Sequence, residues 1–451
     1  MPRCSRPPCT PGRPGEGTLS GAAADAPETE APPPGRPAPH ALRVPAFRRY
    51  VIGQLVSNIG TWMQRAAQDW LVLQLTGHSG TAVGIVTALQ FLPQSLLGLW
   101  GGVIADRYPK RTLLLITQSL MAGQALLLGM LTLGDTVRVW HVHALALALG
   151  VATALDGPAR NAFIGELVGR QRLSSAVSVN AAQFNAARFL GPAAAGVTIA
   201  AIGSGWVFLL NAVSYAAVLA GLATMRPSAL TSPLRRAAKE VRLTDALWYI
   251  RATPALRRTI LLTAVIGTFS LNFQVTVSLM AATEFHTGAA AFGALSSAYA
   301  VGSLFGALRG AGRRRPPSLR LLVGWAATFG LLETAAGVMP TPVGCAVVLI
   351  PTGAAAVLVT TMANTLVQLT TDPDMRGRVL SVYFLVLLGG TPVGAPLVGW
   401  IAQTFGARYG LVLGGMAGLL AAGTIAAVSL ASAHPNGEAF RDPATTGLRD
   451  V

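Results

Sequence analysis

Two ionisable residues at helical spacing lie inside the first long apolar run of the chain. Arg65 and Asp69 are four residues apart, and Asn58 and Gln68 fall on the same side of a helix. A carboxylate that binds a proton in one state and pairs with an arginine in another can couple proton movement to a conformational change. The pattern predicts either such a substrate or coupling pair, or a structural pair that neutralises itself at a helix interface or near the membrane surface.

A second polar helix face precedes a glycine-proline pair. Gln183 and Arg188 lie in the run 174–201, and Gly191 and Pro192 follow them. Proline removes a backbone hydrogen bond, and a membrane helix tolerates the resulting bend where neighbouring helices support it. We therefore expect helix flexing or close packing here. Arg188 is a candidate substrate or anion contact, or the partner of an acid such as Asp156 or Asp69.

A single acid, Glu333, lies in the run 319–338 and is an alternative proton carrier. Asn272 and Gln274 are candidates for cavity lining or for polar contacts between helices. No catalytic triad, phosphate-binding loop or zinc spacing accompanies them in the sequence. The chain is therefore predicted not to be an enzyme and to use no cofactor, with a proton gradient rather than ATP as its energy source.

The composition places these residues in a membrane. The chain is 52% hydrophobic and 12% charged, whereas soluble domains carry about 25% charged residues. Apolar runs of roughly 20 residues are long enough to cross a bilayer. The sequence predicts an all-α polytopic membrane protein with twelve transmembrane helices in two six-helix bundles, and the runs are 50–75, 81–105, 112–133, 139–156, 174–201, 205–225, 259–282, 288–309, 319–338, 343–369, 379–404 and 409–432.

The basic residues predict the orientation of the chain. The net charge is +16, but it lies in loops, so nucleic acid is not an expected partner. Alternate loops hold 21 arginines and lysines, whereas the loops on the other side hold only Arg138 and Arg408. Because basic loops stay in the cytosol, both termini are predicted to be cytosolic. No signal peptide is visible, and the inner (cytoplasmic) membrane is the expected location.

The expected domain organisation follows from these runs. Residues 1–45 are rich in proline, glycine and alanine and read as a disordered cytosolic tail. The two bundles are expected at 46–225 and 259–432, with a second tail at 433–451. The linker 226–258 contains a basic amphipathic segment that suits anionic lipid at the membrane surface, or alternatively a regulatory partner.

The two halves of the chain contain related motifs. The spacing Gly98-x3-Gly102-x3-Asp106 returns 204 residues later as Gly302-x3-Gly306-x3-Gly310, without the acid. Internal repeats of this length are typical of secondary transporters, which place the substrate at the repeat interface.

The segment after the second run resembles the signature of the major facilitator superfamily. That signature is Gly-x-Leu-Ala-Asp-Arg-x-Gly-Arg-Lys, and this chain reads Gly102-Val-Ile-Ala-Asp106-Arg107-Tyr-Pro-Lys110-Arg111. The resemblance implies a conformational latch formed by Gly102, Asp106, Arg107, Lys110 and Arg111, in which the acid meets a helix N-terminus and a loop arginine. An interaction made in only one state shifts the equilibrium by its differential energy.

Three further segments are similar to the branch that contains the enterobactin exporter, macrolide efflux and transmembrane secretion effector groups. They are Gly60–Gly77, Asp156–Arg160 and Asn185–Pro192. The resemblance implies proton-coupled export of a small amphipathic or drug-like compound or a siderophore, by a protein that works as a monomer in the lipid bilayer. A solute uptake symporter and a non-transporting membrane scaffold or sensor remain the alternatives.

Overall fold

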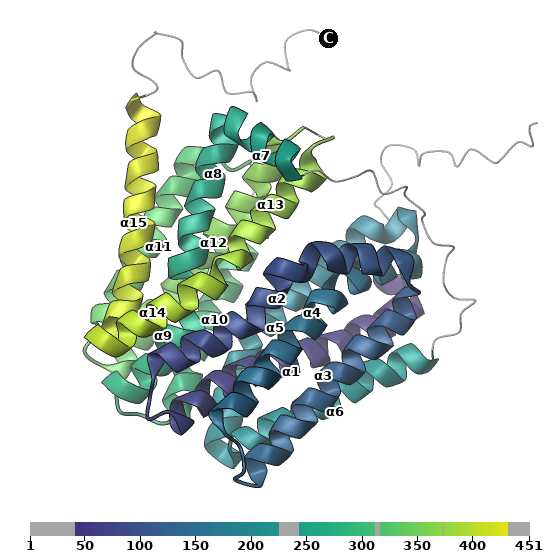
Figure 1. Cartoon of the computed structure of the whole chain (residues 1–451). Coiled ribbons are helices and arrows are strands. Elements are labelled where there is room, and N and C mark those ends of the chain that lie inside the picture. The colour runs from purple at the N-terminus through teal and green to yellow at the C-terminus, as the bar shows by residue number, and fades with distance from the viewer. Residues whose placement is uncertain (1–40, 225–242, 312–315, 373, 432–451) are drawn as a thin grey trace, which may run out of the picture. The chain divides into compact units, whose positions relative to one another are not determined.

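The computed structural model describes residues 41–224, 243–311, 316–372 and 374–431, which form helices joined by short loops (Figure 1). The tails at 1–40 and 432–451 and most of the amphipathic linker segment lie outside the described residues. The first half of the chain comprises α1 (Pro45–Leu75), α2 (Gly80–Arg107), α3 (Lys110–Leu133), α4 (Val139–Val168), α5 (Leu173–Ile202) and α6 (Ser204–Thr224). The second half comprises α7 (Leu243–Ala252), α8 (Pro254–Val265), α9 (Phe273–Leu279), α10 (Ala289–Ala311), α11 (Leu319–Val338), α12 (Pro342–Thr370), α13 (Arg376–Gly389), α14 (Thr391–Phe405) and α15 (Ala407–Ala431).

Short irregular helices complete these elements. One-turn 3-10 helices precede α1 and α5. A π-helix at Ile266–Ser270 lies between α8 and α9, and a second one at Met280–Glu284 follows α9. The described parts of the chain contain no strand. The prediction of an all-helical protein is therefore confirmed.

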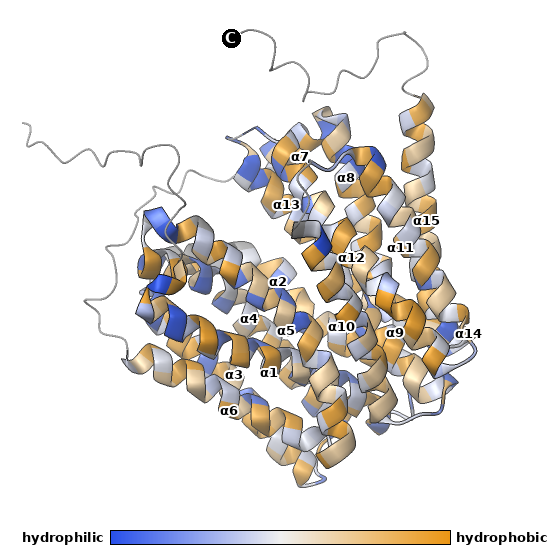
Figure 2. Cartoon of the chain, turned by 180° about the vertical axis from the view of Figure 1, so that it is seen from behind, coloured by the Kyte–Doolittle hydropathy of each residue, from blue (hydrophilic) through white to orange (hydrophobic). Residues whose placement is uncertain are grey.

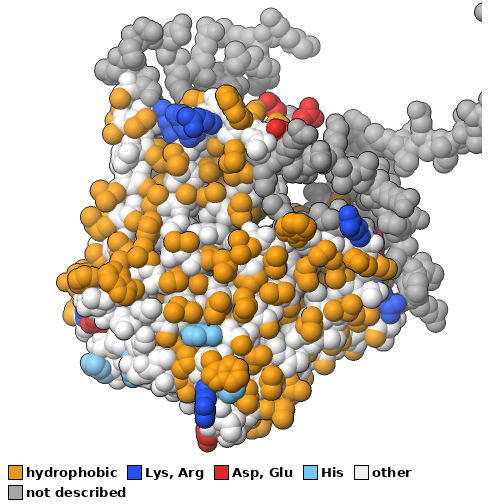
Figure 3. Space-filling view, viewed as in Figure 1, with side chains coloured by type: hydrophobic (Ala, Val, Ile, Leu, Met, Phe, Trp, Pro, Cys, Tyr) orange, Lys and Arg blue, Asp and Glu red, His pale blue; other side chains and the backbone are white. Residues whose placement is uncertain are grey.

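Ten of the described segments are long and apolar enough to cross a membrane. The two long helices outside this set are α1 and α5, which have 31 and 30 residues but carry the ionisable residues of the two polar faces. On the side seen in Figure 3, hydrophobic side chains cover the middle of the molecule and charged ones lie towards its ends. Figure 2 shows the same preponderance of hydrophobic residues from behind. The chain is a multi-pass membrane protein.

The helix ends define two faces of the molecule. The short-loop face carries the connections before α2, α4, α6, α10, α12 and α15, and the arginine-rich face carries the connections before α3, α5, α7, α11 and α13. On the arginine-rich face, α7 is fixed to the second half because Tyr249 donates a hydrogen bond to Asp372 Oδ2 (3.0 Å) and Asp245 pairs with Arg378 (3.4 Å).

The two halves approach each other through glycines. Helix α2 packs on α14 and α5 packs on α10, and Figure 1 shows both pairs side by side. A Cβ at Gly84 would lie 2.6 Å from Pro396 Cα, and one at Gly293 would lie 2.8 Å from Gly196 Cα. Carbon atoms out of bonding contact prefer about 3.5 to 4.0 Å. Only glycine therefore permits these helix crossings.

Polar and aromatic contacts add to the glycine contacts near the short-loop face. The Gln403 side-chain oxygen of α14 accepts hydrogen bonds from Ser79 Oγ (2.8 Å) and from the Thr81 amide (3.0 Å) at the start of α2. Trp70 of α1 stacks on Phe292 of α10 with ring centroids 5.6 Å apart. The halves are therefore held together where α2 begins and α14 ends.

Helix α4 is longer than the apolar run predicts. The run ends at 156, but the helix continues to Val168, because its last turns are amphipathic and still pack on neighbouring helices. Asp156 and Arg160 therefore both lie inside the helix, whereas the predicted run placed its end at Asp156. Asp156 is fully buried and pairs with Arg160.

Three helices meet at this ion pair. Asp156 accepts hydrogen bonds of 2.9 Å from Thr117 Oγ1 and Gln118 Nε2 of α3. Arg160 donates one of 3.1 Å to the Asn58 side-chain oxygen of α1. The charges are thus compensated by each other and by polar neighbours, as a buried ion pair requires.

Replacing Asp156 with Ala should strongly destabilise the protein, because Arg160 would remain buried without its counter-charge. Loss of one partner of a buried pair typically costs about 3–5 kcal/mol, and thermal unfolding of the purified protein measures it. The control is Asp245→Ala, which removes the carboxylate of a partly exposed pair with Arg378 and should cost at most about 1 kcal/mol. Equal effects of the two variants would contradict this assignment.

Replacing Gly84 with Leu should separate α2 from α14, because the new side chain would overlap the backbone of α14. Spin labels on cysteines placed at His78 and Thr404, both exposed, would report a longer distance in pulsed resonance measurements than in the parent protein. Gly123→Leu is the matched control, since no atom lies within 4 Å of a Cβ at that position. An unchanged distance in Gly84→Leu would show that the contact does not hold the halves together.

Candidate functional site

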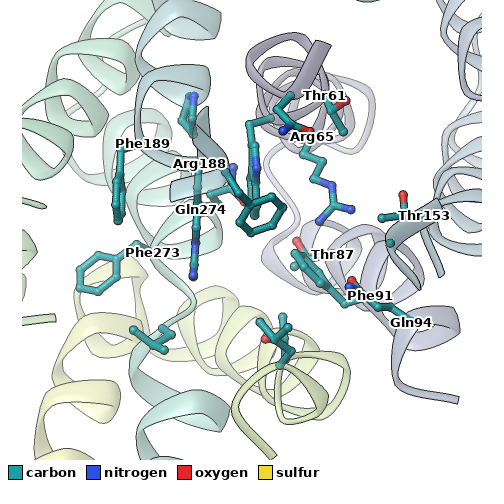
Figure 4. Close-up of a pocket in the computed structure, with 18 of the residues that line it drawn as sticks. Thr61, Arg65, Thr87, Phe91, Gln94, Thr153, Arg188, Phe189, Phe273 and Gln274 are labelled. Atoms are coloured by element: carbon teal, nitrogen blue, oxygen red, sulfur yellow. The ribbon is translucent and has the colours of Figure 1, made fainter. Parts of the chain in front are cut away.

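A large cavity lies between the two halves of the chain. It encloses about 1520 Å³ of space free of protein atoms, including the part open to solvent. Its walls come from α1 to α6 on one side and from residues 271–277, α10, α13 and α14 on the other. Figure 4 shows side chains of both walls around the same space.

Arg65 of α1 lines this cavity and lies over aromatic rings. Its side chain is almost fully buried at 3% exposure, and its Cζ atom lies 4.5 Å from the Phe91 ring centroid and 5.0 Å from that of Trp62. Its Nε atom is buried without a hydrogen-bond partner. Cation–π attraction stabilises such a guanidinium by about 0.5–2 kcal/mol, so the rings occupy the place expected for a carboxylate.

Asp69 lies one turn further along α1 but forms no ion pair with Arg65, which corrects the predicted pairing. Asp69 is fully buried and its Oδ1 atom accepts a hydrogen bond of 3.3 Å from Thr87 Oγ1 of α2, while Oδ2 has no partner. The Arg65 side chain contacts the rings of Trp62 and Phe91, whereas the Asp69 side chain contacts Thr87, one turn before Phe91 on α2. Asp69 is therefore behind the cavity wall rather than in its lining.

The other polar residues of α1 separate into two groups. Asn58 lines the cavity and accepts the hydrogen bond from Arg160 described above. Gln68 is fully buried outside the lining and accepts a 3.0 Å hydrogen bond from Gln90 of α2. The first therefore faces the cavity, and the second joins α1 to α2.

Helix α5 brings Arg188 and Pro192 into the cavity lining. The Arg188 Cζ atom lies 5.7 Å from the Trp62 ring centroid, on a different helix from Arg65. Neither Asp156 nor Asp69 pairs with Arg188, because Asp156 pairs with Arg160 and Asp69 with Thr87. Arg188 therefore forms no ion pair with either of the acids suggested by the sequence.

The remaining α5 candidates have packing contacts. Gln183 is buried and donates a 2.9 Å hydrogen bond to Asn180 of the same helix. A Cβ at Gly191 would lie 2.9 Å from the Met63 amide nitrogen, so this glycine permits close contact between α5 and α1. The helix nevertheless continues through Pro192 from Leu173 to Ile202.

Glu333 is not among the described residues that line the cavity. It is 2% exposed on α11 and packs at Gly414 of α15, where a Cβ on that glycine would meet the carboxylate. Its Oε2 atom has no partner. The structure thus does not bring Glu333 together with Arg65, Asp69 or Arg188 in the cavity lining.

The latch segment lies at the arginine-rich face. Arg107 is exposed, Lys110 pairs with Glu166 (3.6 Å), and Arg111 donates hydrogen bonds to the carbonyls of Leu222 (2.9 Å) and Ala223 (3.0 Å). A cation at the last carbonyls of α6 interacts favourably with the helix dipole. Gly102 and Asp106 belong to α2, but their side chains and surroundings lie outside the described residues.

The structure adds aromatic residues that the sequence analysis did not single out. Trp62, Phe91 and Phe184 line the first-half wall, with Trp62 contacting both rings. Phe273 and Tyr299 line the second-half wall with centroids 4.3 Å apart. Asn272 and Gln274, which the sequence left open, are also in the lining. The sequence could have indicated Trp62, because it lies three residues before Arg65 and therefore on the same face of the helix.

Comparison with known proteins identifies the family to which the chain belongs. A model of the transmembrane secretion effector family matches residues 37–444. The staphyloferrin A transporter of Staphylococcus aureus is 33% identical over 158 residues, which cover 35% of this chain and 40% of that protein. This chain therefore aligns with less than half the length of that relative.

Longer matches extend over most of the chain. The enterobactin exporter of Salmonella typhimurium is 24% identical over 390 residues, which cover 84% of this chain and 93% of the exporter. The solved structure of a mutant nucleoside transporter, NupG, superimposes with a TM-score of 0.69 at 13% identity, covering 85% of this chain and 99% of that one. This last likeness shows the fold. The resemblance found in the sequence is confirmed: the chain belongs to the transmembrane secretion effector family of the major facilitator superfamily.

Proposed function

We propose that the chain is a secondary active transporter that exports a small amphipathic or drug-like compound, or a siderophore, in exchange for protons. The observation that carries the proposal is the cavity between the two halves, which holds ionisable side chains without ion-pair partners. Ionisable residues inside a membrane protein are costly and usually mark a transport pathway. Twelve helices in two six-helix bundles would then move relative to each other around this cavity.

The direction of transport is inferred from relatives and from charge. A relative that matches over most of the chain is named an exporter of enterobactin, whereas the fold alone also occurs in a nucleoside transporter. The arginine-rich face is assigned to the cytosol of the inner membrane by the positive-inside rule. The contacts at the short-loop face would then close the cavity to the outside, so that a cytosolic substrate enters it first.

Asp69 is the proposed proton carrier. It is buried next to the cavity, one of its oxygens has no partner, and its neighbour on the same helix is a cation that lines the cavity. A rotation of Arg65 away from the rings toward Asp69 would favour the charged carboxylate, and its return would favour proton uptake. The protein would thereby link the protonation of Asp69 to the conformation of Arg65.

Helix movement would use the features around this pair. Gly191 permits α5 to contact α1 closely, and Pro192 lines the cavity one residue later. The segment from Gly102 to Arg111 is proposed to stabilise one conformation at the cytosolic face. A non-transporting scaffold would have no need for a large cavity with unpaired arginines, and an uptake symporter would use the same cavity in the opposite direction.

Flux measurements test the proposal directly. Everted membrane vesicles that contain the protein should accumulate a member of a panel of fluorescent amphipathic compounds and iron-free siderophores when respiration generates a proton gradient. A protonophore should abolish this accumulation. Accumulation that survives the protonophore would refute proton coupling, accumulation only in right-side-out vesicles would indicate uptake, and no flux together with a stable co-purifying protein would favour a scaffold.

Replacing Asp69 with Asn should reduce proton-driven flux to background, because an amide can keep the Thr87 hydrogen bond but has no carboxylate that can bind and release a proton. Exchange of labelled for unlabelled substrate across the membrane, which needs no net proton movement, should persist. Glu333→Gln is the matched control and should retain proton-driven flux. A fully active Asp69→Asn protein would remove Asp69 from the mechanism, and loss of activity only in Glu333→Gln would transfer the role to Glu333.

A further inference from the structure

The charges around the cavity are unbalanced. Three residues of its described lining belong to the types Asp, Glu, Lys, Arg and His, and all three are arginines: Arg65, Arg160 and Arg188. Arg160 pairs with the fully buried Asp156, so its charge is compensated. No aspartate or glutamate is among the described lining residues. The described lining therefore presents the positive charges of Arg65 and Arg188 without a lining carboxylate, and neither arginine forms an ion pair with a described acid.

The two guanidinium groups have aromatic neighbours in place of carboxylates. Trp62 contacts both, with its ring centroid 5.0 Å from Arg65 Cζ and 5.7 Å from Arg188 Cζ. The nearest acid along α1, Asp69, is hydrogen-bonded to Thr87. Figure 4 shows both arginine side chains in the same pocket. Their planar donor groups are suited to a carboxylate or a phenolate, which they can bind by paired hydrogen bonds.

The opposite wall supplies polar groups without charge. Asn272, Gln274, Ser296 and Tyr299 line it, together with Phe273. These groups can form hydrogen bonds with a ligand, and the rings can stack against a flat group. Nothing in the described lining compensates the charge of a bound cation, which would also be repelled by Arg65 and Arg188.

We propose that the substrate of this cavity is a small molecule that carries a negative charge on an aromatic group, with Arg65 and Arg188 binding the charge. The aromatic residues Trp62, Phe91, Phe273 and Tyr299 bind the flat part of the molecule. This inference rests on the proposed function, because it assumes that the cavity is the transport site. It excludes the cationic amphipathic compounds that would otherwise fit a proton-driven exporter.

Three probes of matched shape test the charge preference on the purified full-length protein in lipid nanodiscs. They are 2-naphthoate, the neutral 2-naphthamide and the cationic 2-naphthylmethylammonium ion, and calorimetric titration without a proton gradient gives their affinities. Naphthoate should bind at least about tenfold more tightly than the amide, a ratio equal to about 1.4 kcal/mol, and the cation should not bind. The proposal would be overturned if the cation, or chloride alone, bound with the same affinity as naphthoate.

Variants identify the residues that bind the charge. Arg188→Gln and Arg65→Gln should each weaken naphthoate binding at least about tenfold, whereas Arg188→Lys and Arg65→Lys should keep the preference for the anion over the cation. Arg320→Gln is the control, because Arg320 is exposed at the start of α11 outside the described cavity lining, and it should bind naphthoate as the parent does. Unchanged binding in both cavity glutamine variants would contradict the assignment.

The outcomes separate this proposal from the proposed function. If Arg65→Gln fails to fold, the three-probe comparison in the parent and the Arg188→Gln variant still decide the charge preference. Selective binding of naphthoate with no proton-driven flux of any compound would uphold the anion site and contradict proton-coupled export. Proton-driven export of a cation through a cavity that does not bind naphthoate would uphold proton-coupled export and contradict the anion site.

Discussion

Ionisable side chains inside a membrane protein raise its free energy unless other groups compensate their charge, and this constraint determines how the helices are arranged. Helices α1 and α5 carry polar faces that lipid would not tolerate, and both are packed against other helices and line the cavity. The protein lowers the free energy of its buried charges in two ways. Asp156 and Arg160 compensate each other within a network that joins α1, α3 and α4, whereas Arg65 lies over aromatic rings without a counter-charge. The first arrangement stabilises the first half, and the second leaves charge available to a ligand.

The contacts between the halves have a different physical basis. Glycine backbones at the α2–α14 and α5–α10 crossings approach too closely to admit a side chain, and the Gln403 side chain adds hydrogen bonds to the start of α2. These close contacts lie beside a cluster of buried hydrophobic residues to which both halves contribute. In the proposed transport cycle, these contacts would separate and form again around the cavity. The Asp156 network lies within one half and would remain intact during this movement.

These features combine into one proposed mechanism. An anionic aromatic substrate would supply the negative charge that Arg65 and Arg188 lack. The movement of Arg65 between the aromatic rings and Asp69 would link the protonation of Asp69 to the conformation of the cavity. The mechanism requires only that Arg65 has two alternative partners, and the structure places aromatic rings and a cavity on one side of it and an acid on the other.

Much of the molecule followed from the sequence alone. The length and apolarity of the runs determined the helices, the distribution of arginines predicted the orientation, and the segment Gly102–Arg111 identified the superfamily. The polar faces of α1 and α5 also followed, because spacing along one helix defines which side chains share a face. Spacing does not determine which neighbouring helix meets that face. Only the tertiary structure therefore decided that Thr87 bonds to Asp69, that Trp62 and Phe91 lie against Arg65, and that Arg160 takes the acid proposed for Arg188, since each of these partners comes from a contact that depends on packing.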